Sequence, residues 1–532
     1  MTKILLIGLF FLFLNIVLAK SKSRGNESIV HTEFGSIQGI VHDTNRVFYG
    51  IPFAQPPTGE LRWRDPVDPM PWPNIRDATK QTPECAQICN LGPEACLYIG
   101  VSEDCLYLDV FAPKDSNPNT KYPVVVFIPG GAFSFVWFLG SGSFPIYDGT
   151  KLSQSNVILV NINYRLGTFG FLGTDLLHGN FGFLDQVKAL EWVNKNIGAF
   201  GGNKNMVTLW GESAGAFSVA THLTSKYSRP YFNAAISFSS PLTVGLKDKV
   251  SAKKFAQIFS QNISCNIDDL DCLRNKTMDQ VLNAQVSVAY TLLDPLDTFT
   301  IWSPVIDGDI IPTQPLVAAR DGEAYDVPLI IGSVKDEAVP FVYAFSRKVL
   351  KSEEYKYLIR GVFPSQYLNI LSIYPAGPTE QDNRPILSQL LTDYLFRCQD
   401  RYYLNRIVAN HKSPVYHYQY VHIKPNGDTL EHCDGKVCHG SELSIFFNSY
   451  NLTRENLNQD ERELGIHLNS YIVNFATNHN PNKGLFIPVE WTQVTKTRNS
   501  TLIIDINSTI RDITTNDSKC DAIDKTFYRN QI

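Results

Sequence analysis

Short, nearly continuous apolar runs recur along the chain and constrain its fold more than any other feature. Their ranges are Val124–Ile128, Val157–Ile162, Val207–Trp210, Ala234–Phe238, Pro328–Ile331 and Val415–Tyr420. A strand with one wet face alternates apolar and polar residues, whereas a strand buried on both faces of a parallel sheet is apolar throughout. The runs therefore predict an α/β fold with a doubly wound, mostly parallel sheet.

The segments between the runs favour helices. Leu184–Ile197 carries an apolar stripe at helical spacing, as expected of a helix packed on a sheet. Helix-rich stretches at 250–290 and 350–410 are predicted to be insertions that cover one end of the sheet. No repeat or Pro/Ser-rich linker divides the chain, so we expect residues 20–532 to form a single domain.

Residues 1–19 have the pattern of a secretory signal peptide. One lysine precedes an apolar run from Ile4 to Leu18, and the small residue Ala19 follows. The run is shorter than the roughly 20 residues of a membrane span, so we expect cleavage and no membrane anchor. The mature protein is then secreted or held in the lumen of a secretory or storage vesicle. A net charge of −5 gives no basic stripe, so nucleic acid is not an expected partner.

Secretion changes the meaning of the cysteines and of the glycosylation sequons. In an oxidising compartment the ten cysteines are expected to form disulfides. The Asn-x-Ser/Thr sequons are candidate glycan sites and therefore predicted to be at the surface. They begin at Asn26, Asn262, Asn275, Asn451, Asn499, Asn507 and Asn516.

The stretch Gly211–Gly215 reads GESAG and directly follows an apolar run. G-x-S-x-G occurs often by chance, and the alternative is a glycine-rich turn with an ordinary serine. Here a strand precedes it and a helix-compatible run follows, which is the setting of a nucleophile elbow at Ser213. A serine nucleophile also needs a base that takes its proton and an acid that orients the base.

Candidates for the acid lie after the run Pro328–Ile331. In α/β hydrolases the acid follows a later strand and the histidine comes after it. Asp336 and Glu337 occupy that place, and either is suitable on chemical grounds. The alternative for this pair is a solvated acidic loop.

Seven histidines follow the acidic pair, and His439 stands out among them. The others are His411, His417, His422, His432, His467 and His479. Cys433 and Cys438 could close a small disulfide directly before His439 and so restrict its loop. The alternative is a zinc site formed by these cysteines with His432 and His439, although the spacing is not one of the usual ones.

Several stretches together resemble the type-B carboxylesterase/cholinesterase-like family of α/β hydrolases. They are GIPFAQPPTGELRW, SEDCLYLDVFAP, GNFGFLDQVKALEWVNKNIGAFGGNKNMVTLWGESAG, WSPVIDG, the KDE loop and CHGSEL, in the order of the family. The resemblance extends from about Thr32 to Cys520 and is nearest to the slime-mould crystal-protein esterases. It implies an α/β-hydrolase fold and hydrolysis of a small-molecule carboxylic ester, with no cofactor and no metal.

The resemblance also implies roles for single residues. It makes Ser213 the nucleophile, His439 the base, and Glu337 rather than Asp336 the acid. Two further carboxylates are implied near this triad, those of Glu212 and Glu442.

An oxyanion hole is implied in the same way, formed by the backbone N–H groups of Gly131, Ala132 and Ala214. The family usually has glycine at the position of Ala132, in the stretch VVVFIPGGAF. Alanine keeps the N–H group, but a positive φ is costly for it. Its methyl group is also expected to narrow the acyl or alcohol pocket.

The family's disulfides imply the pairs Cys85–Cys105, Cys265–Cys272 and Cys398–Cys520, which leaves Cys89–Cys96 and Cys433–Cys438 as the remaining pairs.

Because a fold does not fix a function, a non-catalytic or storage/packing protein on the same fold is the alternative to an esterase.

Overall fold

The computed structural model describes residues 29–88, 100–134, 142, 144–289, 300–427, 432–449, 457–512 and 517–526. Several predicted features lie outside these ranges: the signal peptide, Asn26, Cys89, Cys96, Asn451 and Asn516. Within the described ranges, no helix is both long and apolar enough to cross a bilayer.

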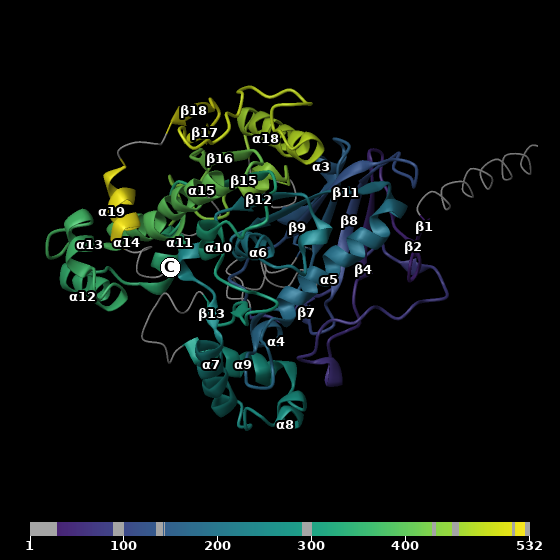
Figure 1. The fold of residues 1–532 in the computed structure, drawn as a ribbon, viewed down its shortest axis with the longest axis horizontal. Coiled ribbons are helices and arrows are strands. Elements are labelled where there is room, and N and C mark those ends of the chain that lie inside the picture. Colours follow the sequence, from purple (N-terminus) through teal and green to yellow (C-terminus); the bar gives the residue numbers. More distant parts are fainter. Residues whose placement is uncertain are drawn as a thin grey trace, which may run out of the picture.

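An eleven-stranded sheet runs through the centre of the molecule (Figure 1). Its seven central strands, from β17 to β10, are parallel, and the outer strands pair antiparallel at both edges. This mostly parallel sheet confirms the predicted fold class. In spatial order the strands are β18 (Thr509–Asp512), β17 (Ser500–Ile504), β16 (Val415–Tyr420), β15 (Leu329–Val334), β12 (Ala234–Phe238), β11 (Gly202–Glu212), β9 (Tyr122–Ile128), β10 (Ile158–Ile162), β8 (Tyr107–Pro113), β4 (Asn45–Pro52) and β3 (Ile40–Val41).

All six apolar runs are strands of this sheet. β12 and β16 have the predicted bounds, whereas β11 begins earlier, at Gly202, and β15 ends later, at Val334. Both extensions come from pairing: Gly202 lies opposite Tyr122, and Val334 lies opposite Tyr420. Smaller sheets combine β1 (Ile29–Thr32), β2 (Gly35–Gln38) and β5 (Arg76–Asp77), β6 (Glu84–Cys85) and β7 (Val101–Ser102), and β13 (Lys247–Asp248) and β14 (Val305–Ile306).

Strand β9 shows why the central runs are apolar throughout. Val124, Val126 and Ile128 belong to one hydrophobic core, and Val125 and Phe127 belong to another on the opposite face. Successive side chains of a strand point to opposite faces, so each face needs apolar residues of its own when helices cover both. The alternation expected of a half-exposed strand is therefore missing.

Helices cover both faces of the sheet. Helix α6 contacts β11 and β9 from one core, and α18 contacts the same two strands from the other. In Figure 1, α5 and α6 lie in front of the strands and α18 lies above them. The helices outside the predicted insertions are α3 (Thr150–Ser153), α4 (Gly167–Phe171), α5 (Phe181–Asn196), α6 (Ala214–His222), α10 (Pro315–Asp321), α11 (Val339–Phe345), α16 (Leu443–Phe446), α18 (Gln459–Asn478) and α19 (Ser518–Thr526).

The two stretches predicted to be helix-rich insertions are helical. The first forms the group at the bottom of Figure 1, and the second extends to its left side. A π-helical turn, Asp393–Arg397, joins two helices of the second group. The helices are α7 (Lys249–Asn262), α8 (Leu270–Arg274) and α9 (Met278–Ala289) in the first group, and α12 (Ser352–Val362), α13 (Tyr367–Ile373), α14 (Arg384–Thr392) and α15 (Cys398–Asn410) in the second.

The strand order reverses at β9. The chain passes from β9 to β10 on one side and then crosses back to β11 on the other side. In open α/β sheets, ligands bind outside the carboxyl ends of the strands at such a switch point. The loop after β9 and the turn after β11 both lie there, and the loops after β15 and β16 end at the same edge of the sheet.

Candidate active site

Ser213 lies at the turn between β11 and α6. β11 ends at Glu212, α6 begins at Ala214, and Ser213 between them has φ 57° and ψ −122°. Positive φ is uncommon for a residue with a side chain, so this turn holds the serine in a strained backbone conformation. The strand, turn and helix are those that the sequence predicts for a nucleophile elbow.

Close backbone contacts explain the two glycines of GESAG. A Cβ on Gly211 would lie 2.3 Å from the backbone of Gly215. A Cβ on Gly215 would lie 2.0 Å from the carbonyl oxygen of Ile128, at the end of β9. Both distances are far shorter than a van der Waals contact. Helix α6 can therefore start this close to β11 and β9 only with glycine at both positions.

The loop after β9 runs beside the elbow. A Cβ on Gly130 would lie 3.0 Å from Cβ of Ser213, which shows how closely the loop backbone approaches the serine. The next three residues have positive φ: 103° at Gly131, 50° at Ala132 and 58° at Phe133. Ala132 thus adopts the conformation that the sequence analysis regarded as costly.

Contacts of Phe133 account for this conformation. Its ring is buried and lies 5.5 Å from the ring of Phe171 and 6.0 Å from that of Phe217. Its carbonyl oxygen accepts the N–H of Gly167 at 2.6 Å. A strained backbone persists only where its surroundings over-determine it, and these contacts do so for the loop.

Glu337 and His439 meet at the carboxyl ends of β15 and β16. Oε2 of Glu337 lies 2.5 Å from Nδ1 of His439, and Oε1 accepts the N–H of Val334 at 2.8 Å. The Glu337 side chain is fully buried, and that of His439 is 11 % exposed. The opposite edge of the imidazole faces the elbow, because Nε2 lies 3.1 Å from Oε1 of Glu212, the residue before Ser213.

Asp336 has a different set of contacts from Glu337. Its N–H donates to the carbonyl oxygen of Val437 at 2.8 Å, and its carboxylate accepts the N–H of Val437 at 3.0 Å. Asp336 therefore holds the loop that carries His439, whereas Glu337 contacts the imidazole itself. The sequence alone allowed either residue as the acid.

The Cys433–Cys438 disulfide closes the loop directly before His439. Both cysteines are buried and pack against α11, the helix that follows Glu337. Since both sulfurs are in a disulfide, neither is the thiolate that a zinc ion would need. Among the described residues, no group of three or more His, Cys, Asp or Glu is arranged to hold a metal ion.

Glu212 and Glu442 lie near the imidazole of His439. Both are buried. Burial raises the pKa of Glu212 to about 7; the charge of Glu337 adds to this, and the charge of His439 opposes it. Burial, followed by the charges of Glu337 and Glu212, raises the pKa of Glu442 well above its ordinary value. Burial and like charges nearby therefore disfavour the ionised forms of Glu212 and Glu442.

The negative charge of the neighbouring carboxylates raises the pKa of His439. Burial by itself lowers the pKa of His439, but the carboxylates of Glu212 and Glu337 outweigh it and raise the pKa to about 9. The site therefore stabilises the imidazolium, which is the state that a histidine base reaches after taking a proton.

Three further residues near His439 could not be identified from the sequence. The rings of Phe341 and Phe396 lie 5.0 Å and 5.3 Å from the imidazole of His439. Asp400, on α15, is buried, and its pKa is raised well above its ordinary value by burial and then by the charge of Glu337. Phe341 lies on α11, whereas Phe396 and Asp400 lie in the second helical insertion. Packing between segments distant in the sequence brings them to His439, so no local pattern marks them.

Two other histidines, one within β16 and one just after it, have partners away from the elbow. His417 is buried in the sheet, with Nδ1 2.8 Å from the hydroxyl of Thr501. His422 lies between Asp505, at 2.8 Å, and Glu461, at 3.2 Å. These carboxylates come from the residue after β17 and the first turn of α18, so His422 does not face Ser213 in the way that His439 does.

Three more of the expected disulfides are present: Cys85–Cys105, Cys265–Cys272 and Cys398–Cys520.

Among the described sequons, those at Asn262, Asn275 and Asn507 are exposed. Asn499 is only 7 % exposed, and its Nδ2 donates to Oδ1 of Asn405 at 3.2 Å. The folded protein therefore presents the first three to solvent and hides the fourth.

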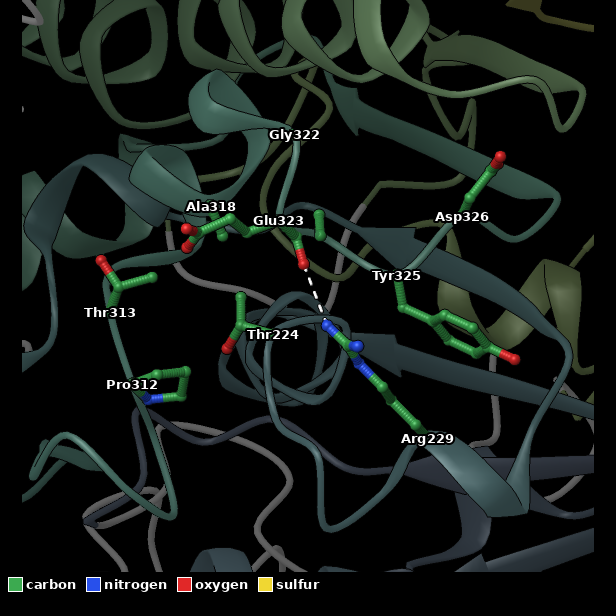
Figure 2. Close-up of a pocket in the computed structure, with 10 residues that line it drawn as sticks. Thr224, Arg229, Pro312, Thr313, Ala318, Gly322, Glu323, Tyr325 and Asp326 are labelled. Carbon is green, nitrogen blue, oxygen red and sulfur yellow. Dashed lines mark hydrogen bonds between the residues drawn. The ribbon is translucent and has the colours of Figure 1, made fainter.

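A surface hollow with a volume of about 490 Å³ lies at the carboxyl end of α6 (Figure 2). Arg229 crosses it, donating to the carbonyl oxygen of Glu323 at 3.1 Å, with its guanidinium 5.7 Å from the ring centroid of Tyr325. Ser213 precedes the opposite end of the same helix. The hollow therefore lies away from the elbow.

A model of the carboxylesterase family matches residues 26–523. The chain belongs to the carboxylesterase family. It is 61 % identical to the cAMP-regulated D2 protein of Dictyostelium discoideum over the whole of both chains. It is 47 % identical to the crystal protein of the same organism, over 99 % of this chain and 97 % of the relative. These matches confirm the resemblance that the sequence motifs predicted.

Carboxylesterase-family structures share the fold. A solved PNB esterase superimposes with a TM-score of 0.80 at 30 % sequence identity, over 94 % of this chain and 100 % of that chain. The superposition covers almost the whole sequence, so the likeness is not limited to the central sheet.

Proposed function

We propose that this member of the carboxylesterase family hydrolyses carboxylic esters through an acyl-enzyme intermediate on Ser213. The observation that carries the proposal is the position of the His439 imidazole. Nδ1 contacts Glu337 at 2.5 Å, and Nε2 is on the side of the elbow. A serine nucleophile needs this arrangement, because a base must take the hydroxyl proton and an acid must orient the base.

The reaction proceeds in two halves. Oγ of Ser213 attacks the ester carbonyl carbon while Nε2 of His439 takes the proton, and Glu337 stabilises the resulting imidazolium. The imidazolium then protonates the leaving alcohol. In the second half, His439 takes a proton from water as the water oxygen attacks the acyl carbon. The bond from that carbon to Oγ then breaks, and the imidazolium returns the proton to Oγ, which releases the acid and regenerates Ser213. One imidazole carries every proton, so these steps require no cofactor.

We assign the oxyanion hole to the backbone N–H groups of Gly131, Ala132 and Ala214. Ala214 is the first residue of α6, so its N–H has no partner within the helix. The positive end of the helix dipole lies at the same place and favours a negative charge. Loss of one such donor costs on the order of 3 kcal/mol of transition-state stabilisation.

The substrate is proposed to be a small-molecule ester with an apolar group beside the triad. Phe341 and Phe396, whose rings flank the imidazole, support this preference. We further propose that the protein is secreted or stored in a vesicle after residues 1–19 are removed. Four disulfides among the described residues support an oxidising compartment.

A storage or packing protein is the second candidate function. The relative named crystal protein, at 47 % identity, favours it. The presence of competent side chains at Ser213, Glu337 and His439 favours catalysis instead, since a packing protein has no need of them.

Hydrolysis of a short-chain nitrophenyl ester separates the two candidates. Wild type is compared with Ser213→Ala, and both are assayed with and without an organophosphate. We expect turnover by wild type, its loss on stoichiometric labelling of Ser213, and an activity lower by a factor of about 10⁴ or more in the variant. An equally inert pair that retains the native fold would leave the storage role as the better assignment.

A further inference from the structure

Gln285 belongs to the first helical insertion, yet its side chain reaches the loop after β9. It lies on α9 and is 2 % exposed. Its Nε2 donates to the carbonyl oxygen of Ser134 at 3.2 Å. Its Oε1 accepts the N–H of Thr168 at 2.7 Å and the hydroxyl of Thr168 at 3.0 Å. One amide thus joins three parts of the chain: α9, the start of α4, and the proposed oxyanion loop.

The backbone at the start of α4 leaves room for the amide of Gln285, because residue 167 is a glycine. Gly167 has φ 56°, and a Cβ there would lie 2.1 Å from Oε1 of Gln285. The N–H of Gly167 in turn donates to the carbonyl oxygen of Phe133 at 2.6 Å. On the other side, the indole N–H of Trp63 donates to the carbonyl oxygen of Thr168 at 2.8 Å. Hydrogen bonds to Trp63 and Phe133 therefore hold the start of α4 in place. The amide of Gln285 is anchored to this fixed backbone through Thr168.

Hydrogen bonds close the loop at successive residues. The N–H of Ser134 donates to the carbonyl oxygen of Gly131 at 3.3 Å. The carbonyl oxygens of Phe133 and Ser134 accept from Gly167 and from Gln285. Because the loop has three consecutive residues with positive φ, each of these bonds opposes its relaxation to an ordinary conformation.

We propose that Gln285 is a positioning residue for the oxyanion hole, through which the helical insertion α7–α9 sets the geometry of the loop at Gly131 and Ala132. Gln285 touches neither the substrate nor the reacting atoms. It acts by holding the carbonyl of Ser134, so that the N–H groups two and three residues earlier keep their direction. This inference rests on the proposed esterase function.

Two variants of Gln285 test the proposal, with a matched control on the same helix. Gln285→Glu keeps the size and the acceptor for Thr168 but loses the donor to Ser134. Gln285→Ala loses both contacts. In the control, Gln280→Ala removes an exposed glutamine whose Oε1 accepts the N–H of Thr277 at the start of α9. Thermal unfolding is measured for each, and Gln285→Glu keeps the test decisive if Gln285→Ala does not fold.

We expect both Gln285 variants to lower kcat about 10- to 100-fold with KM changed less than about threefold, as for partial loss of an oxyanion donor. The control should match wild type. A second readout is the ratio of kcat/KM for an oxygen ester to that for the matching thionoester, whose sulfur accepts hydrogen bonds poorly. A misaligned hole should reduce this ratio at least several-fold.

The outcomes separate this inference from the proposed function. An active wild type with an unchanged ester/thionoester ratio in Gln285→Glu would overturn the positioning role alone. A fall in activity that follows the melting temperature, with the ratio constant, would do the same, since it shows a merely structural glutamine. A wild type that neither hydrolyses esters nor reacts with an organophosphate would overturn both.

Discussion

The two halves of the candidate site are held in place by different means. The half that carries Glu337 and His439 lies on loops after β15 and β16, fixed by the Cys433–Cys438 disulfide and by Asp336. The half that carries Ser213 and the proposed oxyanion loop lies on segments without cysteine, Pro129–Ser134 and Gly211–Gly215. It depends on close backbone contacts at glycines, positive φ angles and hydrogen bonds from Gln285 and Gly167.

The difference follows from what each half has to present. In the proposed mechanism, the imidazole must stay beside Glu337 while it takes and gives a proton. The Cys433–Cys438 disulfide restricts the motion of the loop that carries it. In the role that we propose for it, the loop after β9 must present bare N–H groups, and side chains large enough to anchor it would occupy the space of the substrate. The loop is therefore held through its backbone carbonyl groups, which accept hydrogen bonds from Gly167 and Gln285.

The largest expected effect distinguishes the two neighbouring carboxylates of the first half. Glu337→Gln should lower kcat by a factor of about 10³–10⁴, because an amide neither stabilises the imidazolium nor fixes its tautomer. Asp336→Asn should lower it by less than about tenfold, since an amide oxygen can still accept the N–H of Val437. Steady-state kinetics on one nitrophenyl ester measure both. Equal losses in the two variants would contradict the separation of roles.

Removal of the Cys433–Cys438 disulfide tests whether covalent closure matters for catalysis. The double variant Cys433→Ala/Cys438→Ala should lose about 2 kcal/mol of stability by the loop-entropy relation. It should also lose about tenfold in kcat, because the His439 loop gains freedom.

Cys265–Cys272 offers a matched control, since its cysteines are 7 residues apart and those of the first pair are 5 apart. Cys265→Ala/Cys272→Ala should lose a similar stability with kcat within about twofold of wild type. Calorimetry and kinetics on the same samples decide, and a parallel fall of kcat in both double variants would show a general effect of lost stability.

The carboxylate of Glu212, next to Ser213 in one half, contacts His439 in the other half. The dependence of kcat/KM on pH tests whether its charge acts on His439. His439 must be neutral to act as a base, so kcat/KM rises with pH through its pKa, which Glu212 and Glu337 raise to about 9. Glu212→Gln removes one of these charges, so the rise should move to lower pH, and the plateau should fall because the imidazolium is less stabilised. Glu191→Gln, on α5, is the control and should leave the profile in place. A rise that stays at the wild-type pH in Glu212→Gln would show that Glu212 does not act on the base.

The smallest expected effect lies in the oxyanion loop itself. Ala132→Gly relieves the cost of φ 50° but adds freedom to the unfolded chain, so stability should change by less than about 1 kcal/mol. The lost methyl group should raise kcat/KM for bulky esters more than for small ones. A series of nitrophenyl esters of increasing acyl size measures this, and a uniform change across the series would refute a narrowing role for Ala132.

Much of the fold was predictable because the signals are local. The apolar runs marked six of the seven central strands, all but β17, and GESAG marked the elbow, because a strand buried on both faces and a tight turn each restrict the residue types allowed. The bounds of β11 and β15 were not predictable, since partner strands extend them. Asn499 has a normal sequon, yet its burial against Asn405 depends on the packing of β17.

The sequence by itself determined where backbone must approach backbone, since only glycine fits at Gly211 and Gly215, and which segments are buried on both faces. The tertiary structure decided which acid meets His439: Glu337 rather than Asp336, 102 residues away along the chain. It also decided that Gln285, on an insertion helix, hydrogen-bonds the loop after β9. A steric limit acts on one residue and is therefore visible in the sequence. A contact between distant loops depends on which strands end side by side, and only the folded sheet fixes that.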